Sequence, residues 1–186
     1  MYLYHLCAPD FRGTVLYPLN GLRDTYPDVF ERERVKYDDR ESVMDFEVPL
    51  LGVGWADTVN LSALDPRLLI AERRRLEIPF SQLLTRRLVC IPVERLAGRS
   101  AVRYDSASHW INSSPGDPNV PLSPPAHEFR PFDVSTYDEV REVPARHREY
   151  LLSQRSRGER ALGFVFISHV LVVGAIDLAG LPFVEL

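Results

Sequence analysis

The sequence is poor in lysine and cysteine, and none of its apolar runs is long and uninterrupted. Lys36 is the only lysine among 22 basic residues, and the net charge of -4 gives no overall positive field that would indicate a nucleic-acid partner. Two cysteines, Cys7 and Cys90, are too few for a disulfide framework, and both lie in apolar runs, which predicts buried free thiols. The C-terminal apolar stretch is broken by histidine, aspartate and glycine before it reaches transmembrane length. We therefore expect a cytoplasmic protein without a membrane partner.

The strong catalytic and cofactor motifs are also missing. There is no glycine-lysine phosphate loop, no Gly-x-Ser-x-Gly turn, no His-Glu-x-x-His helix and no paired Cys-x-x-Cys. The segment Gly52-Val53-Gly54 lacks the third glycine of a dinucleotide-binding fingerprint. The five histidines have no metal-ligand spacing, so the sequence predicts no metal site.

Length and composition predict one globular domain that covers residues 1–186. Hydrophobic residues make up 45% of the chain and charged residues 26%, which is the composition of a folded domain rather than a disordered one. Residues 113–125 are rich in proline and serine and predict a flexible loop. Long loops in compact domains are usually functional or mobile, so this loop is a candidate docking site for a protein partner.

Strand-like and helix-like segments alternate irregularly along the chain. Such irregular spacing, without a βαβ rhythm, predicts an α+β domain with a mixed or mainly antiparallel sheet. The expected strands are 2–7, a short piece at 15–17, 58–61, 88–93 with 101–104 as its hairpin partner, extended structure from 129 to 134, and two strands in the last 24 residues. The expected helices are two within 19–38, the second opened by Pro27, one from Asp65-Pro66 to Leu76, a short one capped by Thr136 and Glu139, and one over 145–156 that ends near Gly158.

Two histidines lie in the most apolar segments, one near each end of the chain. Period-two alternation places His5 on one face with Leu3 and Cys7, and places His169 with Val165, Ile167, Leu171 and Val173. A buried histidine loses either its charge or its solvation unless it finds a partner. Two interpretations remain open: each ring is a core histidine bonded to a backbone carbonyl, or both rings face one cleft.

Two tryptophans lie in polar surroundings that suit a binding rim. Trp55 precedes a strand that carries Asn60, and Trp110 lies in a polar and aromatic segment just before the proline-rich loop. A core anchor is the alternative for each tryptophan. Glu128, at the far end of the loop, is a candidate general acid or base.

Several short segments occur in an order that resembles small ADP-ribosyltransferase-type domains. These are Tyr4-His5 on the first strand, the loop and helix of residues 12–22, residues 59–62 on a middle strand, residues 169–173 on a late strand, and the closing segment 176–186. The resemblance implies an ADP-ribosyltransferase-like arrangement of the α+β fold, with NAD as the ligand. In that family the histidine of Tyr-His bonds a ribose of NAD, a role that falls on His5. The matched segments add Tyr4, Arg12, Asn60 and Ser62 to the ligand-binding candidates.

The sequence departs from this family at one catalytic position. The family's catalytic glutamate, which stabilises a ribosyl cation, falls at His169, and an imidazole does not offer a negative charge. If the resemblance holds, three readings remain. The chain lacks ordinary transferase chemistry, it uses Glu128 or Glu139 instead, or it acts on a related ligand. The catalytic candidates are accordingly His169 and Glu128.

A second resemblance concerns Leu16-Tyr17-Pro18-Leu19-Asn20, which is similar to a motif of short uncharacterised bacterial proteins. It implies a bacterial protein and no particular activity. The leading hypothesis is that the chain binds NAD or a related nucleotide near His5, with ADP-ribosyl transfer or NAD cleavage as the reaction if it is catalytic. The alternatives are a non-enzymatic protein-interaction module that uses the loop 113–125, and a hydrolase or nuclease that uses histidine with Glu128.

Overall fold

The computed structural model describes residues 1–186 except 39–40, 80–85, 107–123 and 160. The fold is α+β, as expected from the sequence. Its helices are α1 (Leu19–Thr25), α2 (Pro27–Arg34), α3 (Pro66–Arg75) and α4 (Ala145–Arg157). Its strands are β1 (Tyr2–Cys7), β2 (Val15–Leu16), β3 (Glu47–Val48), β4 (Val53–Gly54), β5 (Thr58–Ser62), β6 (Arg87–Pro92), β7 (Ala101–Tyr104), β8 (Phe129–Pro131), β9 (His169–Val173), β10 (Ile176–Asp177) and β11 (Phe183–Glu185).

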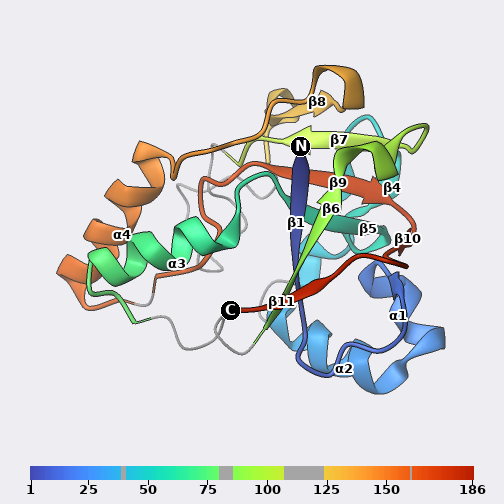
Figure 1. Cartoon of the computed structure of the whole chain (residues 1–186), viewed down its shortest axis with the longest axis horizontal. Coiled ribbons are helices and arrows are strands. Elements are labelled where there is room, and N and C mark those ends of the chain that lie inside the picture. Colours follow the sequence, from blue (N-terminus) through green and yellow to red (C-terminus); the bar gives the residue numbers. More distant parts are fainter. Residues whose placement is uncertain (39–40, 80–85, 107–123, 160) are drawn as a thin grey trace.

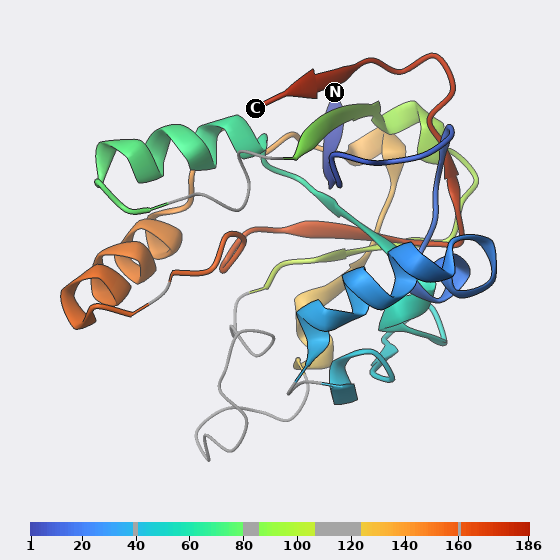
Figure 2. The same ribbon diagram turned by 90° about the horizontal axis from the view of Figure 1, so that it is seen from below.

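The main sheet contains seven strands of the described chain, in the order β11-β6-β1-β5-β9-β7-β8, and every recorded pairing is antiparallel. Figures 1 and 2 show α3 and α4 together at one end of the sheet, and α1 and α2 together near the opposite end. Two small ladders, β10 with β2 and β3 with β4, lie outside the main sheet. No helix among the described residues is long and apolar enough to cross a membrane.

Local signals in the sequence set the helix ends. Asp65 caps α3, because its carboxylate accepts a hydrogen bond from the backbone N–H of Arg67. Pro66 and Pro27 occupy the first turns of α3 and α2, where proline costs no hydrogen bond. Gly158 ends α4 in the left-handed conformation with φ of 68°. The predicted helices at Pro27, at Asp65-Pro66 and before Gly158 are therefore confirmed.

Buried side chains cover both faces of the sheet. One face carries an apolar cluster in which Leu3, Leu61 and Val170 of the main sheet pack against residues outside that sheet, among them Leu16, Leu96, Ile176 and Leu178. The opposite face carries a second cluster of Trp55, Val48, Val102, Tyr104, Phe129 and Leu171. A third cluster joins α3 and α4 through Leu76, Tyr150, Leu151 and Val165.

The sheet is weakly joined between β1 and β5. Strand β1 pairs with β6 over six residues, from Tyr2 to Cys7, but its ladder with β5 has a single registered pair, Tyr4 with Ser62. Strand β5 is in turn paired with β9 along its whole length. The two strands therefore part just beyond Tyr4, at the position of His5.

Two sequence predictions about strands are wrong. Strand β7 is not the hairpin partner of β6: it lies between β9 and β8, because β1 and β11 already occupy both edges of β6. The apolar run before His169 is not part of a strand, since the chain turns there with Phe166 at a φ of 60°, and β9 begins only at His169.

The capping box at Thr136 and Glu139 opens no helix. Asp133 caps a short 3-10 turn over Val134–Thr136 instead, by accepting from the N–H of Ser135, and Glu139 accepts a hydrogen bond from Tyr4. The Glu139 side chain that the capping box required is thus bonded to Tyr4 of β1 instead. The predicted loop 113–125 lies outside the described residues except for its last two positions.

Candidate functional site

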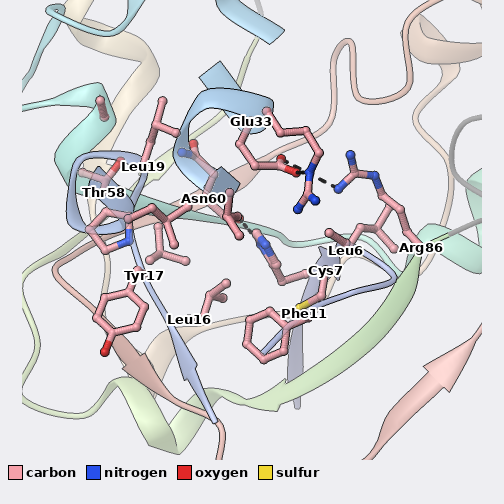
Figure 3. Close-up of a pocket in the computed structure, with 18 of the residues that line it drawn as sticks. Leu6, Cys7, Phe11, Leu16, Tyr17, Leu19, Glu33, Thr58, Asn60 and Arg86 are labelled. Atoms are coloured by element: carbon pink, nitrogen blue, oxygen red, sulfur yellow. Dashed lines mark hydrogen bonds and ion pairs between the residues drawn. The ribbon is translucent and has the colours of Figure 1, made fainter. Parts of the chain in front are cut away.

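A pocket of about 400 Å³ opens where β1 and β5 part. Its wall is formed by the end of β1, the segment that follows it, helices α1 and α2, the start of β5, and His169 of β9. Figure 3 shows side chains from β1, the segment after it, α1, α2 and β5 around this pocket. The volume falls within the range of about 300–1,000 Å³ that is usual for small-molecule sites.

The pocket lies between the strands rather than on one face of the sheet. Leu6 and Cys7 both line it, as do the consecutive residues Thr58, Val59 and Asn60. Successive side chains of a strand point to opposite faces, so both can reach one pocket only where the edge of the strand is open to it. The single-pair junction of β1 with β5 supplies that open edge.

His5 bridges the opening between these strands. Its Nδ1 lies 3.0 Å from the carbonyl oxygen of Asn60 on β5. A carbonyl oxygen accepts only, so Nδ1 carries the proton and donates it, which fixes the tautomer of a neutral ring. His5 therefore combines features of both interpretations. It makes the backbone hydrogen bond expected of a core histidine, and it lines a pocket as expected of a ligand-binding histidine.

His169 lines the same pocket from β9. It lies beyond β5, since Ser62 of β5 pairs both with Tyr4 of β1 and with His169. Burial lowers the pKa of His169 to about 4. The charge of the neighbouring His5 also lowers this pKa, whereas a hydrogen bond to the backbone of Ile167 raises it. The ring is therefore neutral at pH 7, and it meets the ring of Phe164 in an edge-to-face arrangement with 5.8 Å between ring centres.

Aromatic side chains form two parts of the pocket wall. Trp55 and Tyr104 meet edge to face with ring centres 5.8 Å apart, on the His169 side. Tyr17, which precedes α1, and Tyr26, which lies between α1 and α2, have ring centres 6.2 Å apart. Trp55 is thus a buried core anchor and a pocket wall at once, which unites the two interpretations of this residue.

The mouth of the pocket carries ion pairs between the segment after β1 and helix α2. Arg12 lies 2.7 Å from Asp28, and Arg32 lies 2.7 Å from Asp10. The Arg32 guanidinium holds the pKa of Asp10 below its usual value, so this carboxyl is ionised at neutral pH. All four side chains are about half exposed, which keeps each pair weak in water.

Three predicted site residues do not line this pocket. The Tyr4 hydroxyl donates to Oε1 of Glu139 at 2.5 Å, and the Ser62 hydroxyl donates to the carbonyl of Leu64 at 2.7 Å. Glu128 is buried, and strand β7 separates its backbone from β9. The structure thus does not place Glu128 beside His169 in the pocket. Trp110 lies outside the described residues.

The predicted residues that the pocket does bring together are His5, Arg12, Trp55, Asn60 and His169. Sequence reasoning missed Arg32 and Glu33, because the charged run 31–41 is typical of a solvated helix face, and it missed Arg86, because a single arginine before a strand is usually solvated. A usable signal was present in the helix: Glu33 follows Val29 by four residues, which places it on the face of α2 that turns inward.

The described residues contain no group of three or more histidine, cysteine, aspartate or glutamate side chains that could hold a metal ion. Comparisons with protein-family models, with curated proteins and with solved structures found no match to this chain.

Proposed function

We propose that the chain binds NAD or a related nucleotide in the pocket between β1 and β5, with ADP-ribosyl transfer or NAD cleavage as the reaction. The observation that carries this proposal is that His5 and His169, from strands on either side of β5, line one ligand-sized pocket. The resemblance of Tyr4-His5 to the ribose-binding strand of ADP-ribosyltransferases suggests the ligand class.

The chemistry of the pocket wall suits a nucleotide. Imidazole and amide groups at His5 and Asn60 offer hydrogen bonds to sugar hydroxyls, and the tyrosine and tryptophan rings offer flat apolar surfaces to a base. Arginines at the mouth offer donors to phosphate oxygens. The arrangement combines, in one cavity, the three kinds of contact that a nucleotide requires.

The proposed reaction needs a carboxylate other than the family's glutamate. His169 is neutral and provides no negative charge to a ribosyl cation. Among the described residues that line the pocket, the carboxylates are Asp10 and Glu33. Glu33 is the more enclosed of the two, with its side chain 16% exposed against 47% for Asp10. We therefore assign the charge-stabilising role in NAD cleavage to Glu33.

Calorimetric titration with NAD, followed by assay of nicotinamide release, tests this proposal. The wild type should bind NAD, and His5→Ala should weaken binding at least tenfold. His127→Ala is the matched control, because His127 is exposed and does not line the pocket. Glu33→Gln should bind NAD but release no nicotinamide. Absence of both binding and turnover in the wild type would overturn the proposal.

A further inference from the structure

Arg86 is an enclosed cation that lines the pocket, and its ion pair with another described residue is a long one. It directly precedes β6, and its side chain is only 23% exposed. Its recorded ion pair joins Nη1 to Oε2 of Glu33 at 4.0 Å, which is too long for a hydrogen bond. Within the part of the chain that the structure describes, no hydrogen bond to the Arg86 guanidinium is recorded. Enclosing a charged guanidinium costs free energy unless its N–H donors meet acceptors. The pocket that Arg86 lines offers room for a ligand that brings such acceptors.

A second guanidinium approaches the same carboxylate from α2. Arg32 Nε lies 3.6 Å from Oε1 of Glu33, while the other oxygen of Glu33 faces Arg86. Figure 3 shows Glu33 facing Arg86, which lies at the Cys7 end of β1. Burial raises the pKa of the Cys7 thiol to about 12, and the charges of Arg87, Arg86 and Glu33 act on it, which also places Arg86 and Glu33 at this end of the strand.

We propose that Arg86 and Arg32 form a phosphate-binding subsite that holds the diphosphate of the nucleotide. This inference rests on the proposed function and names the part of the ligand that is bound there. A guanidinium presents a planar fork of N–H donors that matches two oxygens of a phosphate group. The two guanidinium groups come from separate elements and lie 3.6 Å and 4.0 Å from different oxygens of Glu33, so each one can take one phosphate group of a diphosphate.

The surrounding charges favour an anion at this position. Three arginines line the pocket, namely Arg12, Arg32 and Arg86, against the carboxylates of Asp10 and Glu33. Arg32 gives up little when it turns to a ligand, because its pair with Asp10 is about half exposed on both sides and water replaces the lost contact. Arg86 gives up no hydrogen bond within the described structure, so a phosphate oxygen adds a partner without removing one.

Titration with inorganic pyrophosphate, ADP and adenosine separates phosphate recognition from base and sugar recognition. Arg86→Gln should bind pyrophosphate and ADP at least tenfold more weakly than the wild type and bind adenosine equally well. Arg32→Gln should show the same pattern with a smaller loss, since Arg32 is the more exposed of the pair. Raised salt should weaken pyrophosphate binding to the wild type more steeply than binding to Arg86→Gln.

Arg157→Gln is the matched control, because Arg157 is an ion-paired arginine at the end of α4, outside the pocket. Thermal unfolding establishes that each variant is folded, and Arg86→Lys, which keeps the charge without the fork, should retain part of the affinity. Pyrophosphate that binds wild type and Arg86→Gln equally, or that binds neither, overturns the subsite. NAD that fails to bind while pyrophosphate binding still depends on Arg86 overturns the nucleotide proposal and leaves a phosphate site.

Discussion

The imidazole of His5 donates from Nδ1 to the carbonyl oxygen of Asn60 at 3.0 Å, across the point where β1 and β5 cease to pair. Regular antiparallel strands satisfy such carbonyls through backbone N–H groups. Here a side chain replaces the missing ladder bond. The same ring therefore links β5 to β1 and lines the pocket. This couples the stability of the β1–β5 junction to the shape of the pocket.

Removal of the His5 donor should destabilise the protein. His5→Phe keeps an aromatic ring but leaves the Asn60 carbonyl without its donor, and we expect the free energy of unfolding to fall by about 1–2 kcal/mol. His5→Gln, which retains a donor, should lose less. Chemical denaturation measures both variants, with the exposed His127→Gln as the control. Equal stability of His5→Phe and wild type would show that the bond does not hold the junction.

A buried arginine on α3 should contribute more to stability than its exposed neighbour. The Arg73 side chain is 3% exposed, and its Nη2 donates to the carbonyls of Ala161 at 2.9 Å and Leu162 at 2.6 Å. Arg73→Met leaves the partly buried carbonyls of Ala161 and Leu162 without this donor, so we expect a loss of about 2–4 kcal/mol in the free energy of unfolding. Arg74→Met, one residue on and exposed, should change it by less than about 0.5 kcal/mol. Similar losses in both variants would contradict this role for Arg73.

Local signals in the sequence were sufficient to predict much of the fold. The proline and aspartate at the start of α3 and the glycine after α4 act within a few residues, so sequence patterns locate those helix ends well. Strand partners are different. Which strands pair with β6 depends on β1 and β11, from opposite ends of the chain, and the hairpin expected between β6 and β7 does not form.

The residues of the candidate site that the sequence singled out by alternation lie on strands. His5 and His169 stand out because a polar ring interrupts an apolar alternation. Arg86 and Glu33 do not stand out, because a charged side chain on a helix or beside a strand is usually solvated. Their enclosure results from the tertiary packing of α2 against the opening between β1 and β5, of which the sequence carries only the spacing of Glu33 from Val29 and nothing for Arg86.

The thiol of Cys7 should be inert in the folded protein although it lines the pocket. Burial raises the pKa of this thiol to about 12, and the thiolate is the reactive form. In a Cys90→Ser variant, a disulfide reagent at pH 8 should label Cys7 only after unfolding in denaturant. The reciprocal Cys7→Ser variant retains Cys90, which is partly exposed and should react faster. Rapid stoichiometric labelling of native Cys90→Ser protein would contradict the enclosed state of Cys7.

Stability should fall on mild acidification because His169 resists protonation. Burial lowers the pKa of His169 from its ordinary value of 6.5 to about 4 in the folded protein. Below pH 6.5 the unfolded chain therefore binds a proton that the folded chain does not. The free energy of unfolding then decreases as the pH falls from about 6.5 towards 4, by up to about 1.4 kcal/mol per pH unit.

His169→Gln should remove this contribution, so its free energy of unfolding should decline less steeply over that pH range. Burial also lowers the pKa of His147, whose Nδ1 donates to the carbonyl of Val165 at 2.7 Å, so part of the decline should remain in His169→Gln. The double variant with His147→Gln should remove that part too. Denaturant unfolding between pH 7 and about 4.5 measures the wild type, the single variant and the double variant, with the exposed His127→Gln as the control. The same pH slope in His169→Gln and wild type would show that His169 titrates as a solvated group and is not enclosed in the pocket wall.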